Sequence, residues 1–208
     1  MLRSGLRWTV LALTAAACAP RPQAAPRSVP TPAEPAAHHH HVPDLPATAG
    51  RGFTVADVRF MQHMIGHHAQ AVQMAALAPT NGASADVVRL ARKIDISQRD
   101  EIAMMKSWLQ ERRQAVPAEA HSHAMMMPGM LTPEQLAQLG RARGREFDRL
   151  FLVLMTRHHE GALQMVQELF RTPGAGQEPD IFRFATDVDA DQRDELVQMD
   201  RLLHTLPR

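Results

Sequence analysis

From residue 53 onward, hydrophobic residues recur every three or four positions, which is the spacing of amphipathic α-helices. The pattern predicts long helices over about 54–78, 84–115, 145–171 and 180–206, with Pro, Gly, Asn and Ser between them. A shorter helix is predicted from the Thr-Pro-Glu-Gln start signal at 132–135, breaking near Gly140 to Gly144. Because no segment alternates as a half-buried strand does, the predicted fold class is all-α.

The long helices form two copies of one unit. At a constant offset of 91 residues, paired histidines and flanking methionines match between Met64, His67, His68 and Met74 and Met155, His158, His159 and Met165. A second match, at an offset of 94, relates residues 94–105 to 188–199. We therefore predict two helical hairpins, about 53–115 and 145–206, joined by a His- and Met-rich linker (116–144). Their apolar stripes would pack as an antiparallel four-helix bundle over 53–206.

Polar residues fall on the predicted inner face of this bundle. The stripes of the first and third helices contain both histidine pairs, at about 100° per residue. The inward rows of the second and fourth helices are Leu90, Ile94, Ser97, Gln98, Glu101, Met104, Met105 and Trp108, and Phe184, Val188, Asp191, Gln192, Glu195, Gln198, Met199 and Leu202. An inward carboxylate without a partner is costly, so we expect Glu101 and Glu195 to meet histidines, a metal ion, or both.

The inner histidines have two interpretations. A single buried His is more often a hydrogen-bonded core residue, and Met at helical spacing usually fills the core. The same residue types recur in both copies, however, and neutral imidazole is the commonest side-chain metal ligand in proteins. We therefore favour a metal site between facing helices, while a polar layer that only fixes helix register stays open as the structural alternative.

The ligand types favour copper. Thioethers are soft and select Cu(I), whereas imidazole accepts both copper states. The linker sequence HSHAMMMPGM (121–130) adds His121 and His123 as candidate ligands. The chain has no Glu-x-x-His, His-Glu-x-x-His or Cys-x-x-Cys-His motif, which disfavours a carboxylate di-iron centre, a zinc hydrolase and covalent haem. A metal-dependent redox enzyme, either a cuprous or a dinuclear oxidase, remains the alternative to a non-catalytic copper-binding protein.

Charge and the N-terminus narrow the choice of partners and location. Lys and Arg number 23 and Asp and Glu 22, so nothing indicates a nucleic-acid partner. Residues 1–18 combine basic residues, a short apolar run and small residues before Cys18, the only cysteine. We predict a signal peptide with a lipobox-like Cys18, then a disordered Pro/Ala/His-rich tether over 19–52. The protein would be exported to the bacterial cell envelope, as a lipoprotein anchored through Cys18 or in the periplasm, and a homo-oligomer stays open.

The doubled Met-x-x-His-His pattern, each copy followed by Gln-Arg-Asp-Glu, resembles the domain-of-unknown-function family number 305 over about residues 53–206. The linker sequence MPGMLTPEQLAQL is also similar to that family's linker. The resemblance implies a ferritin-like four-helix bundle in the bacterial envelope, and some relatives are described as periplasmic copper-binding or copper-resistance proteins. Gly66 and Arg157 stand where the family often has Pro, and His63 replaces a usual apolar residue and could add a ligand.

We therefore expect an envelope protein that buffers, sequesters or delivers copper without catalysis. The candidate metal ligands are Met64, His67, His68, Met74, Met155, His158, His159, Met165, Glu101, Glu195, His63, His121 and His123. Glu101 and Glu195 would either bind the ion directly or orient the imidazoles.

Overall fold

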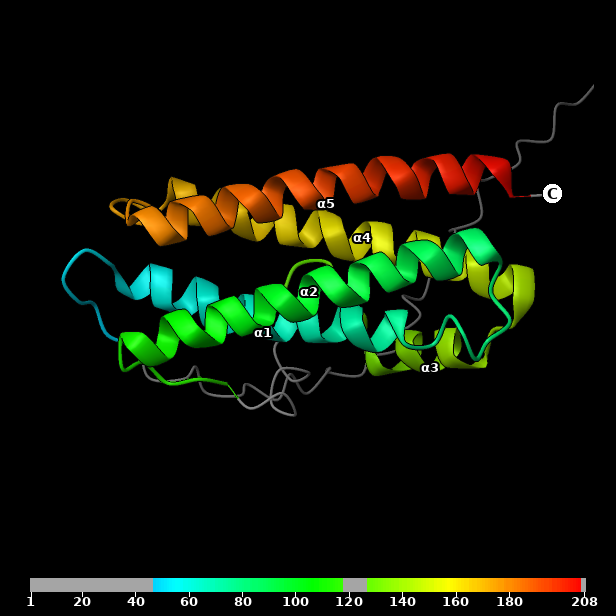
Figure 1. The fold of residues 1–208 in the computed structure, drawn as a ribbon, viewed down its shortest axis with the longest axis horizontal. Helices are drawn as coiled ribbons and strands as arrows, with labels where there is room; N and C mark the ends of the chain where they lie inside the picture. The colour runs from blue at the N-terminus through cyan, green and yellow to red at the C-terminus, as the bar shows by residue number, and fades with distance from the viewer. Residues whose placement is uncertain (1–46, 118–126, 207–208) are drawn as a thin grey trace, which may run out of the picture. The chain divides into compact units, whose positions relative to one another are not determined.

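A computed structural model describes residues 47–117 and 127–206 of the chain. These residues form five helices, α1 (Val55–Ala75), α2 (Ala85–Glu111), α3 (Pro133–Arg141), α4 (Gly144–Arg171) and α5 (Pro179–Thr205) (Figure 1). They contain no strand, only an isolated bridge between Gly50 and Phe53, so the all-α prediction is confirmed. Within this part of the chain, no helix has both the length and the apolar character needed to cross a membrane. The predicted signal peptide with Cys18, residues 19–46 of the tether, His121 and His123 lie outside the described residues.

Short-range signals set where the helices begin. Thr54, Ser84 and Thr132 each accept a hydrogen bond from a backbone N–H in the first turn of α1, α2 and α3. In α1 and α3 the backbone N–H of the cap residue donates in return to the side chain of Asp57 or Gln135, which completes a capping box, as the Thr-Pro-Glu-Gln signal predicts for α3.

The second helix ends earlier than the predicted residue 115. Arg113 takes a left-handed conformation (φ 54°), its N–H donates to the Gln110 carbonyl, and the Gln114 N–H donates to Leu109. This pair of bonds is the Schellman arrangement that closes helix C-termini. Glycine usually fills its left-handed position, so an arginine there gave no sequence signal for the end of α2.

The two hairpins hold one another through a reciprocal pair of aspartates. Asp57, at the start of α1, accepts a hydrogen bond of 2.7 Å from the N–H of Gly176 in the α4–α5 turn. Its repeat counterpart Asp148, at the start of α4, accepts one of 3.1 Å from the N–H of Ser84 at the start of α2. These contacts make α1 and α4 antiparallel neighbours. The helix α1 packs on α2, and α4 packs on α5, while α2 and α5 contact each other less than α1 and α4 do (Figure 1).

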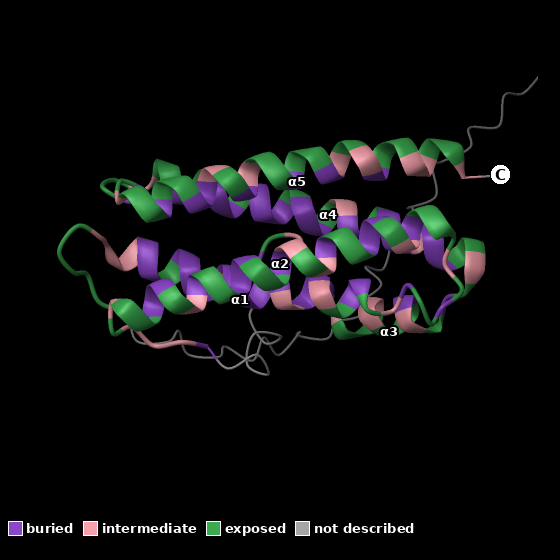
Figure 2. Cartoon of the chain, in the orientation of Figure 1, coloured by how far each residue is buried: buried purple, intermediate pink, exposed green. Residues whose placement is uncertain are grey.

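The buried residues lie on the sides of the long helices that face one another (Figure 2). They form two apolar clusters, one toward each end of these helices. The first contains Phe60 and Met64, and the second contains Met74 and Phe151. Buried polar residues separate the clusters on every long helix: His67 and His68 on α1, Gln98 and Glu101 on α2, His158 and His159 on α4, and Gln192 and Glu195 on α5. We call these eight residues the histidine layer.

The inward rows predicted for α2 and α5 are partly wrong. Met104 is 54% exposed, and Asp191 is also exposed. Both lie at the margin of an inner face that is narrower than the rows assumed, because α2 and α5 contact each other less than α1 and α4 do. The stripes predicted for α1 and α4 are buried throughout.

Candidate metal centre

The four paired histidines converge midway along the long helices. The rings of His67 and His158 stack across the α1–α4 contact, with centroids 3.9 Å apart and planes tilted by 38°. His68 and His159 lie on either side, 6.4 Å and 6.3 Å from their sequence neighbours. None of the four side chains is exposed to solvent. The repeat thus brings two imidazoles from each hairpin into one enclosed space.

A glutamate from the partner helix meets the outer histidine of each pair. His159 Nε2 donates a 2.7 Å hydrogen bond to Glu195 Oε2. The equivalent atoms of His68 and Glu101 are 2.6 Å apart, but their relative orientation is not that of a hydrogen bond, so we describe this only as a close contact. The second oxygen of Glu195 lies 3.6 Å from Lys93 Nζ, whose side chain is half exposed.

A short backbone segment covers the layer where α1 meets α4. In this segment, residues 127–131 (the strap), the Pro128 carbonyl accepts a 3.0 Å hydrogen bond from His67 Nε2. Gln70 holds the strap through both backbone groups of Leu131, at 3.0 Å and 2.7 Å. Gly129 lies directly against the α4 backbone at Gly161, where neither glycine has room for a Cβ. The strap therefore gives His67 a partner that its repeat counterpart His158 lacks.

Several ring nitrogens in the layer have no hydrogen-bond partner among the described residues. They are Nδ1 of His67 and His159 and both nitrogens of His68 and His158, although the His67 carbonyl lies near the His158 ring. Because the Pro128 carbonyl accepts from Nε2 of the neutral His67 ring, its Nδ1 carries a free lone pair. Buried polar atoms in proteins are rarely left unpaired, so these nitrogens require a ligand or another explanation.

The environment keeps the central rings neutral. Burial, and then the neighbouring His68, lowers the pKa of His67 to about 3, although the Pro128 carbonyl acts in the opposite direction. Burial, and then His67, lowers the pKa of His158 well below its usual value. Neutral imidazole is the form that binds metals, so these rings need not lose a proton first.

The predicted thioethers flank the layer on both sides. Met64 and Met165 belong to the first apolar cluster, and Met74 and Met155 to the second. His63 is apart from the layer, partly exposed, and lines a surface hollow with Met165. Across residues 47–117 and 127–206, no three His, Cys, Asp or Glu side chains are grouped where they could hold a metal ion. A metal site built here would need ring rotation, thioether ligands, or both.

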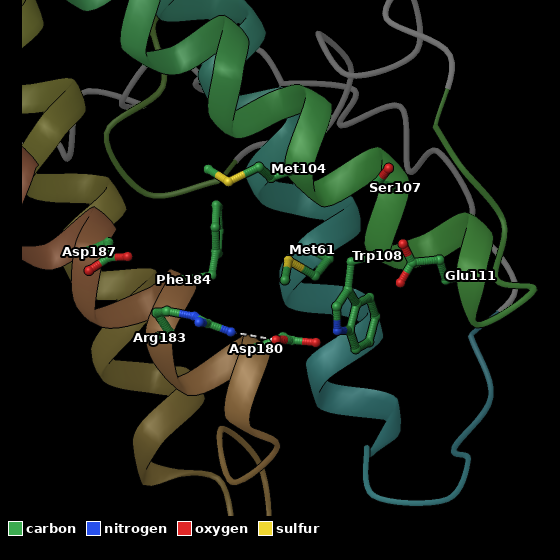
Figure 3. A pocket seen from close by; sticks show the side chains of 9 residues that line it. All are labelled: Met61, Met104, Ser107, Trp108, Glu111, Asp180, Arg183, Phe184 and Asp187. Carbon is green, nitrogen blue, oxygen red and sulfur yellow. Dashed lines mark hydrogen bonds and ion pairs between the residues drawn. The ribbon is translucent and has the colours of Figure 1, made fainter.

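A separate hollow of about 450 Å³ opens between α1, α2 and α5 (Figure 3). Its walls include buried Met61, Trp108 and Phe184, and an Arg183–Asp180 ion pair of 2.6 Å lies at its edge. The exposed Met104 side chain lies here instead of in the core. No histidine of the layer lines this hollow, so it is not part of the candidate centre.

Sequence reasoning missed two parts of the site. The carbonyl of Pro128 carries no side-chain signal, although Gly129 and Gly161 could have indicated a close backbone approach. Lys93 lies on the exposed side of α2 and reaches Glu195 only because α2 and α5 are neighbours. Both contacts depend on tertiary packing.

Comparison with known proteins gives one family. Residues 57–203 match the model of the family described as domain of unknown function (DUF305). A DUF305 fragment from Deinococcus radiodurans is 31% identical over 77% of this chain and 100% of its own, with a TM-score of 0.64. A DUF305 protein from Streptomyces coelicolor, provisionally classed as secreted, is 29% identical over 74% of this chain and 94% of its own, with a TM-score of 0.63.

A further similar structure is that of CopM in its Cu(I)-bound form. It is 29% identical over 71% of this chain and 95% of its own, with a TM-score of 0.58. CopM structures with Cu(II) and with Ag bound are also similar to this chain. No curated protein matches the chain significantly. The family match extends over most of the described residues, and the chain belongs to the DUF305 family.

Proposed function

We propose that this protein binds copper in the bacterial cell envelope and buffers, sequesters or delivers it, without catalysing a reaction. The observation that carries the proposal is the set of four buried imidazoles, two of them held neutral, with ring nitrogens that have no hydrogen-bond partner among the described residues. Buried thioethers lie in the apolar clusters on both sides of them. Imidazole and thioether together suit Cu(I), and imidazole alone suits Cu(II).

In this proposal the ligands come from both copies of the repeat: Met64, His67, His68, Met74, Met155, His158, His159 and Met165. Glu195 fixes the ring of His159 through Nε2, which directs Nδ1 toward an incoming ion. Glu101 would do the same for His68 or bind the ion itself. His63, His121 and His123 would be accessory ligands that receive copper at the surface.

Similarity to relatives supports the setting of this function. CopM binds Cu(I), Cu(II) and Ag in structures similar to this chain, and the S. coelicolor relative is classed with secreted proteins. We propose that residues 1–18 direct export, that Cys18 carries a lipid anchor, and that residues 19–52 tether the domain. The domain itself would be an antiparallel, ferritin-like four-helix bundle formed from the two hairpins.

The test is copper stoichiometry and affinity, measured by anaerobic competition with a chromophoric Cu(I) chelator. We expect tight Cu(I) binding that His67→Gln/His158→Gln weakens strongly and that Met64→Leu/Met165→Leu weakens partly. Met61→Leu is the matched control, because Met61 is buried in the same cluster but is not a proposed ligand. Parallel loading with Cu(II), Zn(II) and Fe(II) tests metal selectivity. If the His67→Gln/His158→Gln protein binds Cu(I) as tightly as the wild type, the layer is not the copper site.

One observation favours a second candidate, a polar layer that only fixes the packing of the helices. The described residues present no group of three His, Cys, Asp or Glu side chains around one point, and Glu195 and Pro128 already hold His159 and His67. A layer of this kind would specify helix register without any ion. It predicts that replacement of the layer histidines changes stability and leaves copper binding unaltered.

A further inference from the structure

The histidine layer is covered differently on its two sides, where α1 meets α4 and where α2 meets α5. Where α1 meets α4, the strap lies over the layer, with its Pro128 carbonyl on His67 and its Gly129 backbone against α4. Gln70 fastens it from α1 through both backbone groups of Leu131. An ion approaching from this side would have to displace backbone that is hydrogen-bonded and closely packed.

The opposite side, between α2 and α5, carries charged side chains. These two helices contact each other less than α1 and α4 do. Lys93 on α2 and Asp191 on α5 are exposed there, while Glu195 is almost fully buried beneath them. Lys93 Nζ lies 3.6 Å from Glu195 Oε1, and the other oxygen of Glu195 holds His159.

The electrostatic environment of Asp191 ties this surface to the layer. Partial burial raises the pKa of Asp191, and the nearby carboxylates of Glu101 and Glu195 raise it further, whereas Lys93 lowers it. Asp191 is therefore close enough to both layer glutamates for their charges to raise its pKa. From the solvent inward, the exposed carboxylate of Asp191 is followed by the buried carboxylate of Glu195 and then by the imidazole of His159.

We propose that a cation reaches the histidine layer by passing between α2 and α5, and that Lys93 restricts this entrance. The proposal rests on the copper-binding function proposed above. The Lys93 ammonium is paired with the Glu195 oxygen that does not bond His159, so an arriving cation has to displace the ammonium from that oxygen. Asp191 attracts cations to the same point from outside, and Glu195 passes them to His159. Removal of the lysine charge should speed uptake, and removal of the aspartate charge should slow it.

The experiment follows Cu(I) transfer from a chromophoric chelator to the full mature chain by anaerobic stopped-flow absorbance. The phase that disappears in His67→Gln/His158→Gln reports on the layer, separately from copper bound elsewhere on the chain. In this phase we expect Lys93→Met to be faster and Asp191→Asn slower, each by about 3- to 10-fold at low salt. High salt should reduce both differences, because it screens exposed charges.

Lys106→Met is the matched control. It removes the same charge from the same helix, but Lys106 lines a hollow with Ala69 and Val72 of α1, away from α5. We expect its uptake rate to equal that of the wild type. Thermal unfolding followed by circular dichroism checks that every variant is folded.

Uptake at the wild-type rate in both Lys93→Met and Asp191→Asn would overturn the entrance. So would a larger acceleration by Gln70→Ala, which loosens the strap, because access would then lie on the α1–α4 side. If no uptake phase depends on His67 and His158, the copper function itself fails and the entrance falls with it. The two failures are therefore distinguishable.

Discussion

Gly161 on α4 is the position where a single methyl group should disturb the candidate centre most. A Cβ there would collide with the Pro128 carbonyl and would lie 2.7 Å from Gly129 Cα, closer than real Cβ atoms approach. The obstacle is backbone, so the strap must retreat, and its 3.0 Å bond to His67 lengthens beyond hydrogen-bond range. Overpacking costs about 1–3 kcal/mol. A buried donor left unpaired costs about 1–3 kcal/mol.

The higher helix propensity of Ala offsets about 1 kcal/mol of these two costs. Gly161→Ala should therefore destabilise the fold by about 1–5 kcal/mol in total. Urea unfolding followed by far-UV circular dichroism measures this free energy directly. The control is Gly140→Ala in α3, where an added Cβ meets no atom within 4 Å, and which should be unchanged or slightly more stable. Equal stability of the two variants would refute the argument that the strap is packed tightly on α4.

Two further predictions concern acid and the aspartates that join the hairpins. The folded protein does not bind a proton at His67 until about pH 3, whereas the unfolded chain binds one below about 6.5, so stability should fall as pH falls through this window. In His67→Gln the loss of unfolding free energy across this pH window should be smaller by up to about 5 kcal/mol. Urea unfolding at several pH values measures this, and an unchanged pH profile would contradict the prediction. Asp57→Asn should cost about 1.5–3 kcal/mol, because a charged acceptor of the Gly176 and Thr54 N–H groups is lost. Asp95→Asn, at a partly exposed position, removes a surface pair with Arg99 and should cost less than about 1 kcal/mol. Equal losses for the two variants would argue against the aspartate contact between hairpins.

The periodic pattern predicts most of the helical fold because burial on one face is recorded in the spacing of residues. Every stripe residue predicted for α1 and α4 is buried, and the capping signals at Ser84 and Thr132 mark true helix starts. The pattern fails where tertiary geometry decides the outcome. Met104 is apolar and adjacent to buried Met105, yet it is exposed because α2 packs less closely on α5 than α1 packs on α4.

The candidate centre could be predicted in its residue types but not in its asymmetry. The repeat alone indicated that two histidine pairs and two glutamates face inward, and all of these side chains are buried together. A repeat predicts equivalent halves, however, and the strap accepts a hydrogen bond from the ring of His67 but not from that of its counterpart His158 in the described part of the chain. Its position depends on a backbone carbonyl and on two glycines, Gly129 and Gly161, that allow close approach. None of these atoms appears in a pattern of side chains.

This asymmetry separates the two candidate functions through one pair of variants. His158→Leu removes two buried nitrogens that have no hydrogen-bond partner among residues 47–117 and 127–206, so its stability should stay within about 1 kcal/mol of the wild type. His67→Leu leaves the Pro128 carbonyl without its donor and should cost about 1–3 kcal/mol more than His158→Leu. If His158 serves copper, His158→Leu should remain stable while its Cu(I) affinity, measured by chelator competition, falls. A large loss of stability with unchanged copper affinity would instead make His158 a structural residue, because only packing would then account for an imidazole at that position.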